Sequence, residues 1–406
     1  MATGRIVIVI CLVVTCISLG IGVIIGYFVR EGGQDLPRRD RRACGTGSGS
    51  NIPQIDRFLE SCQVTACRAE TCDIPLPRSY VAYHLKEQTI AVDGDLNDPA
   101  WEEVPWTEKF VDLRGTDYPK PLYDTRVKIR WDDTHLYVGA YLQDEHVWAN
   151  KTKHDSHVFN DNAFEIFVDV DGSTHNYKEI EINALGTIWD LMLTKAYIDG
   201  GRALSNWESD VEKAILVDGN INDPDSPNKF WTVEMKFPLS RLRSGTTRDV
   251  NSIPRDKETW RMVLARSHWA HKIVDGQYVK DESKEANWWS WQPHGAVSLH
   301  LPDRWGLLQL SRDTPENFQF TPSALLPVKQ ALFDSFKAMK SYYISYGVYT
   351  TNVDMLELPP YIVTGECVGK PTVVPDRGAL YHQYTITGHC YNPARPYSRG
   401  QARLVR

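Results

Sequence analysis

A short run of alternating residues carries side chains suited to bind a ring-shaped polar ligand. If residues 163–170 form a strand, Glu165, Phe167 and Asp169 share one face, and apolar side chains occupy the other. An aromatic ring beside a carboxylate suits a sugar, because axial C–H groups stack on the ring and hydroxyls donate to the carboxylate. We therefore expect carbohydrate to be bound at this strand.

A second candidate feature is the segment Asn-Trp-Trp-Ser-Trp, which places Trp288, Trp289 and Trp291 close together. The chain contains 13 tryptophans, and such flat apolar side chains suit ring-shaped ligands as well as packing. The segment is thus either part of the ligand site or a loop supported by its own indole rings.

Paired carboxylates raise the alternative of glycoside hydrolysis, which needs two of them roughly 5 to 9.5 Å apart. Candidates are Glu165, Asp169, Glu179 and Glu181. However, Glu179, Glu181 and Asn183 would share a strand face without apolar neighbours, which predicts a solvated face. The sequence contains no G-x-S-x-G, HExxH or P-loop motif, so a binding module is favoured over an enzyme.

A cluster of oxygen ligands at Asp93, Asp95 and Asp98 predicts a structural calcium ion, since hard cations prefer such groups. The alternative is purely structural. Asp98 before Pro99 is a good helix start, and Asp93 before Gly94 favours a turn.

The elements that must position these residues are short strands. Apolar alternation between Asp, Gly, Asn and Pro clusters predicts strands at residues 125–131, 135–143, 163–170, 177–184, 187–193, 211–217, 230–237, 260–268 and 305–310. Residues 79–312 are therefore expected to form an all-β, antiparallel sandwich or barrel, without the long helices of a parallel α/β sheet. A net charge of -7 with mixed signs argues against a nucleic-acid partner.

Four stretches in this order resemble the family 9 carbohydrate-binding modules and their DOMON-like relatives. They are VDGDLNDPAW at 92–101, VKIRWDDTHLYV at 127–138, NDNAFEIFVD at 160–169 and HLPDRWGLL at 300–308. The resemblance implies a jelly-roll-like β-sandwich that binds a glycan at the loops and edge of one face, often with structural calcium.

The same resemblance assigns roles to single residues. Sugar-binding members place a terminal sugar between two tryptophans and bond its hydroxyls through a glutamate, an arginine and an asparagine. Glu165 matches the glutamate, and Phe159 occupies the position of the first tryptophan. Leu299 falls near the position of the second tryptophan, and Glu181 occupies the position of the arginine with the opposite charge. Trp288, Trp289 or Trp291 would have to supply the missing ring; otherwise the chain is an adhesion or scaffold protein that has lost sugar binding.

The N-terminal region predicts a membrane anchor. After a tail of residues 1–5, residues 6–29 carry no charge and are long enough to span a bilayer. We expect an uncleaved signal-anchor helix, although a cleaved signal peptide is the alternative. Gly22 and Gly26 would permit a helix-mediated dimer. Residues 30–78 are expected to form a flexible, cysteine-containing stalk, followed by the sandwich outside the cytoplasm as in a single-pass type II protein.

Processing signals agree with an extracellular or lumenal location. Six cysteines lie outside the apolar run, as expected for disulfides in an oxidising compartment: Cys44, Cys62, Cys67, Cys72, Cys367 and Cys390. Asn150 begins a glycosylation sequon. The basic run of Arg39, Arg41 and Arg42 resembles a furin-type cleavage site, which would release a soluble fragment.

The C-terminal tail, residues 313–406, differs from the sandwich in pattern. Apolar residues recur at helical period over 328–343, and two strand-like runs follow around a Pro-Asp-Arg-Gly turn. Cys367 and Cys390 are placed so that a disulfide would tie the two runs together. We therefore expect one helix and a hairpin appended to the sandwich.

Overall fold

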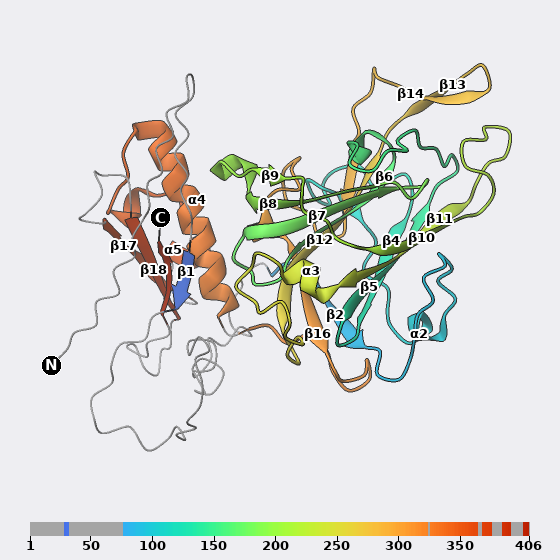
Figure 1. Cartoon of the computed structure of the whole chain (residues 1–406). Helices are drawn as coiled ribbons and strands as arrows, with labels where there is room; N and C mark the ends of the chain where they lie inside the picture. Colours follow the sequence, from blue (N-terminus) through green and yellow to red (C-terminus); the bar gives the residue numbers. More distant parts are fainter. Residues whose placement is uncertain are drawn as a thin grey trace.

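The computed structural model describes residues 28–31, 76–323, 325–363, 368–375, 384–390 and 401–405. They form a large β-sandwich and a smaller unit of helix α4 (Leu326–Tyr346) with a four-stranded sheet. Figure 1 shows α4 lying between the small sheet and the sandwich.

The sandwich consists of short strands with few helices. Its strands are β2 (Ser79–His84), β3 (Val111–Asp112), β4 (Thr125–Trp131), β5 (His135–Gln143), β6 (Ala163–Asp169), β7 (His175–Asn183), β8 (Ile188–Lys195), β9 (Ala203–Leu204), β10 (Glu212–Val217), β11 (Phe230–Pro238), β12 (Thr259–His268), β13 (His271–Val274), β14 (Gln277–Lys280), β15 (Asn287–Ser290) and β16 (Gly306–Ser311). Helical turns are α2 (Pro99–Glu102), α3 (Leu239–Arg243), η2 (Val158–Asn160), η3 (Tyr197–Asp199) and η4 (Pro302–Arg304).

Hydrogen bonds join 13 strands into one sheet, with the order β10-β11-β5-β4-β2-β16-β12-β6-β7-β8-β9. The sheet curls on itself into a sandwich. Strand β12 pairs with β16 through its first half and with β15 through its second half, and β3 pairs with β15. The predicted β-sandwich is confirmed, but its purely antiparallel character is wrong, because β2 pairs in parallel with both β16 and β4.

The core explains why apolar residues recur at every second position of these strands. Side chains of one parity from β4, β5, β6, β7, β11 and β12 meet between the two layers of the curled sheet. Trp131, Trp231 and Trp260 are fully buried there, as are Phe164 and Ile180. Much of the high tryptophan content therefore serves packing.

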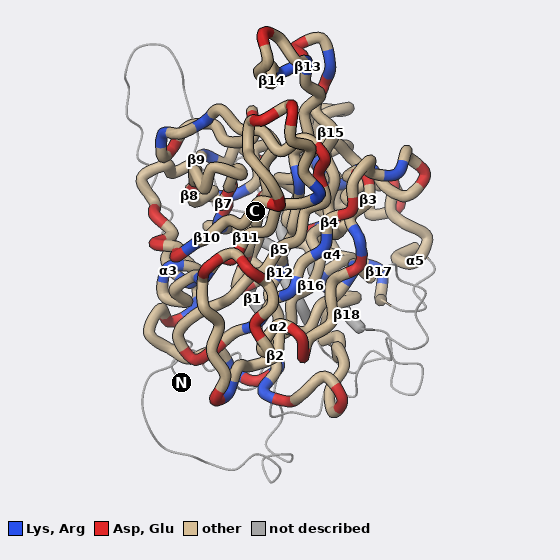
Figure 2. Tube along the Cα trace, turned by 90° about the vertical axis from the view of Figure 1, so that its right-hand side faces the viewer, with Lys and Arg blue, Asp and Glu red and all other residues tan. Residues whose placement is uncertain are grey.

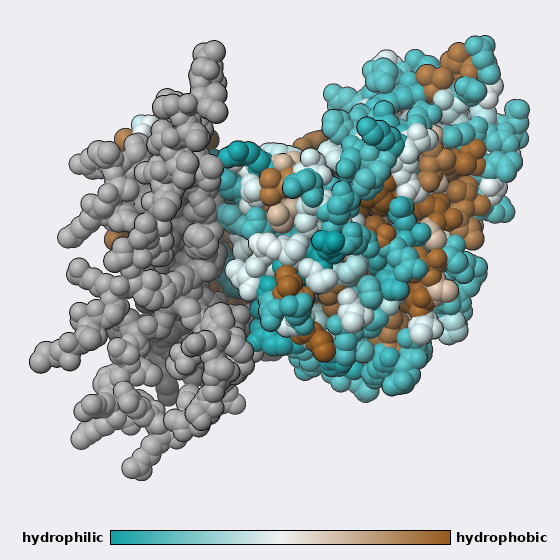
Figure 3. All heavy atoms as spheres, in the orientation of Figure 1, coloured by the Kyte–Doolittle hydropathy of each residue, from teal (hydrophilic) through white to brown (hydrophobic). Residues whose placement is uncertain are grey.

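All nine expected strands are present, and their ends differ from the prediction by at most two residues. Strand β2 was not predicted. The segment Asn287–Ser290 was expected to form a loop but is strand β15, because it continues the sheet beside β12. The β13–β14 hairpin was also missed; it projects from the sandwich at a corner where apolar atoms gather, and it exposes Ile273 and Val274 (Figures 1 and 3).

The tail contains the predicted helix, which extends slightly beyond the expected range. With it come η5 (Val353–Met355), α5 (Pro360–Val363), β17 (Val368–Pro375), β18 (Tyr384–Cys390) and β19 (Gln401–Val405). Strands β17 and β18 form the predicted hairpin, and Val368 lies opposite Cys390. Cys367 lies outside the described residues, so the disulfide stays a prediction.

Most of the N-terminal region also lies outside the described residues, including Arg39, Arg41, Arg42 and the four cysteines between residues 44 and 72. Strand β1 (Phe28–Glu31) pairs with β19, so the last two residues of the expected helix at 6–29 lie in a strand. Among the helices of the described residues, none has the length and apolar composition required to cross a bilayer.

Candidate functional site

The register of five strands assembles the candidate site as rows of side chains on one sheet face. Residues directly opposite each other in antiparallel strands point to the same side. Trp189 of β8 is opposite Glu181 of β7, which is opposite Glu165 of β6, which is opposite Ala265 of β12. The next row contains Glu179. Three carboxylates from two adjacent strands therefore meet on the face away from the main core.

These three residues, Glu165, Glu179 and Glu181, form what we call the carboxylate cluster. They are 1%, 4% and 2% exposed, so the predicted solvated face is wrong. Positive and negative residues are interspersed along the described chain (Figure 2), whereas here three acids are buried together. Such crowding is costly unless protons or a ligand offset the charge.

The protonation of the cluster follows from this burial. Desolvation, followed by repulsion from Glu179, raises the pKa of Glu165 well above its ordinary value. Desolvation raises the pKa of Glu179 to about 8, and desolvation together with the neighbouring carboxylates raises that of Glu181. Glu165 Oε1 and Glu179 Oε2 are buried without a hydrogen-bond partner. Burial therefore favours the protonated form of these carboxyls, and two of their oxygens have no partner in the described residues.

Aromatic rings line one side of the cluster. The Phe159 ring centroid is 5.6 Å from that of Trp189, and His157 stacks on Phe159 at 5.6 Å. The Phe159 amide donates to Glu181 Oε2 at 2.8 Å, and its carbonyl accepts from Trp269 Nε1 at 2.7 Å. Phe159 and Trp189 are only partly buried, and both lie next to Glu181, through the Phe159 amide and through the pairing of β8 with β7.

Two of the three tryptophans in the Asn-Trp-Trp-Ser-Trp segment pack in the core, and the third lies on the face of the candidate site. Trp291 is fully buried and donates to Glu108 at 2.9 Å, and Trp289 is 4% exposed and stacks on His268. Both serve packing. Trp288 is partly buried and lies opposite Ser267 on the face that carries Glu165. We call Phe159, Trp189 and Trp288 the aromatic rim.

Trp288 and Trp189 stand at opposite ends of the site. Four strand spacings separate β15 from β8, which corresponds to about 19 Å along the sheet. This spacing is that of the two backbones, and both side chains pack against the same apolar cluster that contains Phe167 and Trp305. The pair formed by Phe159 and Trp189 is the closer stacking surface.

The remainder of this face is filled by protein. Leu299 and Trp305 pack against Phe167, Tyr177 and their apolar neighbours. The Tyr177 hydroxyl lies 3.0 Å from His300 Nδ1, and burial lowers the pKa of His300 to about 4. Phe167 and Tyr177 are thus core residues, and Leu299, which stands near the second tryptophan of the resembled family, is buried with them.

The predicted calcium loop is organised by hydrogen bonds. Asp93 Oδ1 accepts from the Asp95 amide, and Asp98 Oδ2 accepts from the Ala91 amide. Glu234 accepts from the Asp93 and Gly94 amides at 2.9 and 2.8 Å. Among the described residues, Asp93, Asp95 and Asp98 do not form a group whose ligand atoms all lie within 4.8 Å of one another. Calcium binding at this loop stays a prediction.

Asn150 is exposed, as a glycosylation site requires, and its modification stays a prediction.

Trp189 was not recognised as a site residue from the sequence. Its strand parity, shared with Leu191 and Leu193, could be read from the sequence, but only the strand register places it beside Glu181.

Comparison with known proteins gives one family and several structures. A family model described as "Carbohydrate family 9 binding domain-like" matches residues 92–312. No curated protein matches the sequence. Similar solved structures include a candidate carbohydrate-binding protein from Bacteroides uniformis, with 17% identity, a TM-score of 0.43 and coverage of 58% of this chain and 100% of the other.

Two further structures are of a family 9 carbohydrate-binding module from Caldicellulosiruptor kristjanssonii. The complex with cellotriose has 14% identity and a TM-score of 0.37, covering 61% of this chain and 100% of the module. The complex with glucose has 15% identity and a TM-score of 0.36, covering 60% and 100%.

Proposed function

Because this chain belongs to the carbohydrate family 9 binding domain-like family, we propose that its β-sandwich binds a glycan at the carboxylate cluster and aromatic rim. In this site a sugar ring stacks on Phe159 and Trp189. Its hydroxyls reach Glu165 and Glu179, which supply acceptor oxygens and, where protonated, donors.

One observation carries the proposal. Glu165 and Glu179 each hold a buried carboxylate oxygen without a partner, and both neighbour Glu181, which lies beside the partly buried Phe159 and Trp189. Folded proteins rarely leave buried polar atoms unpaired, so such atoms indicate a bound partner or a functional role. A polyhydroxylated ring is a partner that satisfies both the free acceptors and the open ring surfaces.

The test is a glycan-array screen of the full chain, followed by calorimetric titration with the best glycan, with cellotriose and with glucose. Trp189→Ala should weaken binding about tenfold or more, because it removes a stacking surface. Trp106→Ala is the matched control, since Trp106 is a partly buried tryptophan that contacts Tyr141 in the other part of the sheet. Equal affinities for the two variants, or no glycan bound at all, would contradict the proposal and favour a scaffold protein.

A second candidate function is hydrolysis of O-glycosyl bonds. The raised pKa of Glu179 favours it, since a carboxyl protonated near neutral pH can act as a general acid. Incubating the full chain with cellotriose and measuring released glucose distinguishes hydrolysis from binding. Release that Glu179→Gln and Glu165→Gln both abolish would identify an enzyme.

We also infer that the apolar run from residue 6 up to the start of β1 at Phe28 anchors the chain in a membrane and that the sandwich lies outside the cytoplasm. The apolar run and the cysteine distribution support this location. Expression in a secretory cell line should attach a glycan at Asn150, detected as a mass loss on glycosidase treatment. Asn150→Gln should remove the effect, and an unmodified Asn150 in the wild type would contradict the inference.

A further inference from the structure

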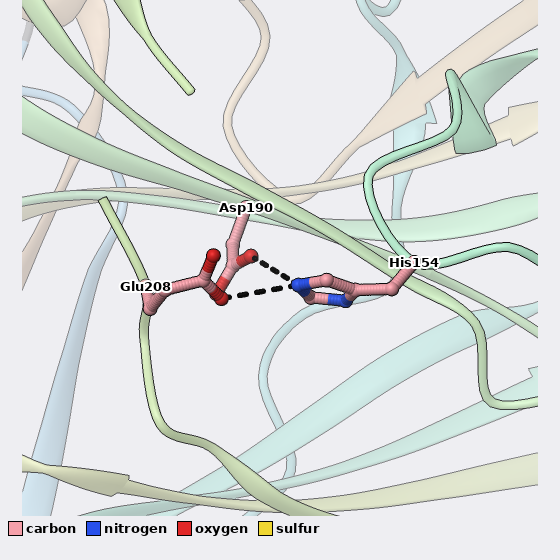
Figure 4. A group of neighbouring side chains, drawn as sticks. All are labelled: His154, Asp190 and Glu208. Atoms are coloured by element: carbon pink, nitrogen blue, oxygen red, sulfur yellow. Dashed lines mark hydrogen bonds and ion pairs between the residues drawn. The ribbon is translucent and has the colours of Figure 1, made fainter. Parts of the chain in front are cut away.

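A second cluster of side chains lies behind the candidate sugar site, on the opposite face of β8. His154 Nε2 lies 3.0 Å from Glu208 Oε2 and 3.8 Å from Asp190 Oδ1. Asp155 Oδ1 lies 3.6 Å from the same nitrogen. Figure 4 shows the two carboxylates of Asp190 and Glu208 pointing at the imidazole. One nitrogen and several oxygens thus converge from separate parts of the chain.

Asp190 gives the independent indication of a ligand. The residue is 1% exposed, and its Oδ2 accepts from the Ser209 amide at 2.6 Å. Its Oδ1 is buried without a hydrogen-bond partner and faces His154 Nε2. An ionised carboxylate oxygen buried without a partner is costly, and a cation bound at that oxygen removes the cost.

The fold holds these groups in place through its backbone. The Asp155 amide donates to the carbonyl of Ile188 at 3.0 Å, which fastens the loop carrying His154 to β8 beside Asp190. The Ser209 amide fastens the segment carrying Glu208 to Asp190 itself. Hydrogen bonds from backbone amides therefore hold the segments that carry His154 and Glu208 beside Asp190.

The spacing and chemistry fit a particular class of ion. Zinc in a tetrahedral site has ligand bonds of about 2.0–2.1 Å, so its ligand atoms stand about 3.3 Å apart. The separations from His154 Nε2 lie on both sides of that value. Imidazole nitrogen favours zinc and related first-row ions, whereas calcium and magnesium take oxygen ligands.

We propose that His154, Asp190 and Glu208 bind a divalent transition-metal ion of the zinc class, with Asp155 as an adjacent oxygen donor. His154 and Glu208 are about half exposed, which leaves the ion open to solvent on one side. The site lies outside the Asp93 loop for which calcium is predicted.

The metal would also brace the candidate sugar site. His154 belongs to the loop that continues into His157 and Phe159, and Asp190 follows Trp189 in β8. An ion that joins this loop to β8 fixes Phe159 against Trp189. This consequence rests on the proposed function, whereas metal binding itself does not.

The test uses the full chain, purified without a polyhistidine tag and stripped with a chelator, and titrated calorimetrically with Zn²⁺. One equivalent should bind with a micromolar or lower Kd and raise Tm. Substituted Co²⁺ should give visible absorption without a thiolate charge-transfer band, which separates this site from the cysteines. His154→Ala and Glu208→Gln should each weaken binding at least tenfold.

Glu212→Gln is the matched control, because Glu212 is an exposed acid four residues beyond Glu208 that pairs with Lys236. It should retain the wild-type Kd. Absence of this one-equivalent binding, or a Kd unchanged by His154→Ala, would overturn the proposal. Ca²⁺ binding as tight as Zn²⁺ binding would overturn the zinc-class assignment. Sugar affinity need not be measured, so failure of this site and failure of the proposed function are distinguishable.

Discussion

Replacing Glu179 by Gln should change how the stability of the protein depends on pH. In the folded chain, burial raises the pKa of Glu179 from 4.5 to about 8. Between these values the folded state holds a proton that the unfolded state has released. The free energy of unfolding therefore falls as pH rises across this window, and the favourable contribution is complete only below about pH 4.5.

The magnitude follows from the size of that displacement. Each tenfold change in proton affinity corresponds to about 1.4 kcal/mol, so a rise from 4.5 to about 8 is worth at most about 5 kcal/mol. Glu165 and Glu181 share the field of Glu179, and their titration reduces the part attributable to one residue. We expect about 2–4 kcal/mol between pH 5 and pH 9.

Glutamine mimics the protonated carboxyl at every pH, so Glu179→Gln should lack this loss. Urea denaturation of the wild type and the variant at pH 5, 7 and 9 measures the difference. The variant should match the wild type closely at pH 5 and exceed it in stability increasingly at pH 7 and 9. The exposed substitution Glu212→Gln should leave the profile parallel to the wild type. Parallel profiles for Glu179→Gln as well would refute the assignment of a buried, protonated Glu179.

Two further predictions concern stability. Asp144→Asn should cost about 3–5 kcal/mol in urea denaturation, because it leaves Arg266, fully buried and 2.6 Å from Asp144, without its counter-charge; a loss below 1 kcal/mol would show that water reaches the arginine. Glu234→Ala should lower the free energy of unfolding by about 1–3 kcal/mol, because Glu234 accepts from Trp101 Nε1 and from the Gly94 amide. An unchanged Tm for Glu234→Ala would show that the loop at Asp93 and Gly94 does not depend on the Glu234 carboxylate.

Much of the fold was predictable because strand alternation is local. The core-facing parity of β4, β5, β6 and β11 is set by residues that alternate along a few positions, and each strand appears where the pattern indicated. Parallel pairing of β2 was not predictable, because it depends on which distant strands become neighbours. Strand β15 was missed for the same reason.

The candidate site shows the same division. The sequence indicated that Glu165 and a nearby ring share a ligand-binding role, from strand parity and family resemblance. It also suggested that Glu179 and Glu181 lie on a solvated face, since polar residues at alternate positions usually do. In the structure, pairing with β6 and β8 and cover from the Leu299 loop bury that face instead.

The sequence by itself determined where the strands lie, which parity faces the core and that the chain resembles a carbohydrate-binding family, because these depend on local pattern and motif order. Only the tertiary structure decided which tryptophans pack in the core, as Trp291 does, and which lie beside the carboxylate cluster, as Trp189 does. It also brought His154, Asp190 and Glu208 together. Such groupings depend on sheet register and loop closure between distant segments, and no local spacing in the sequence encodes them.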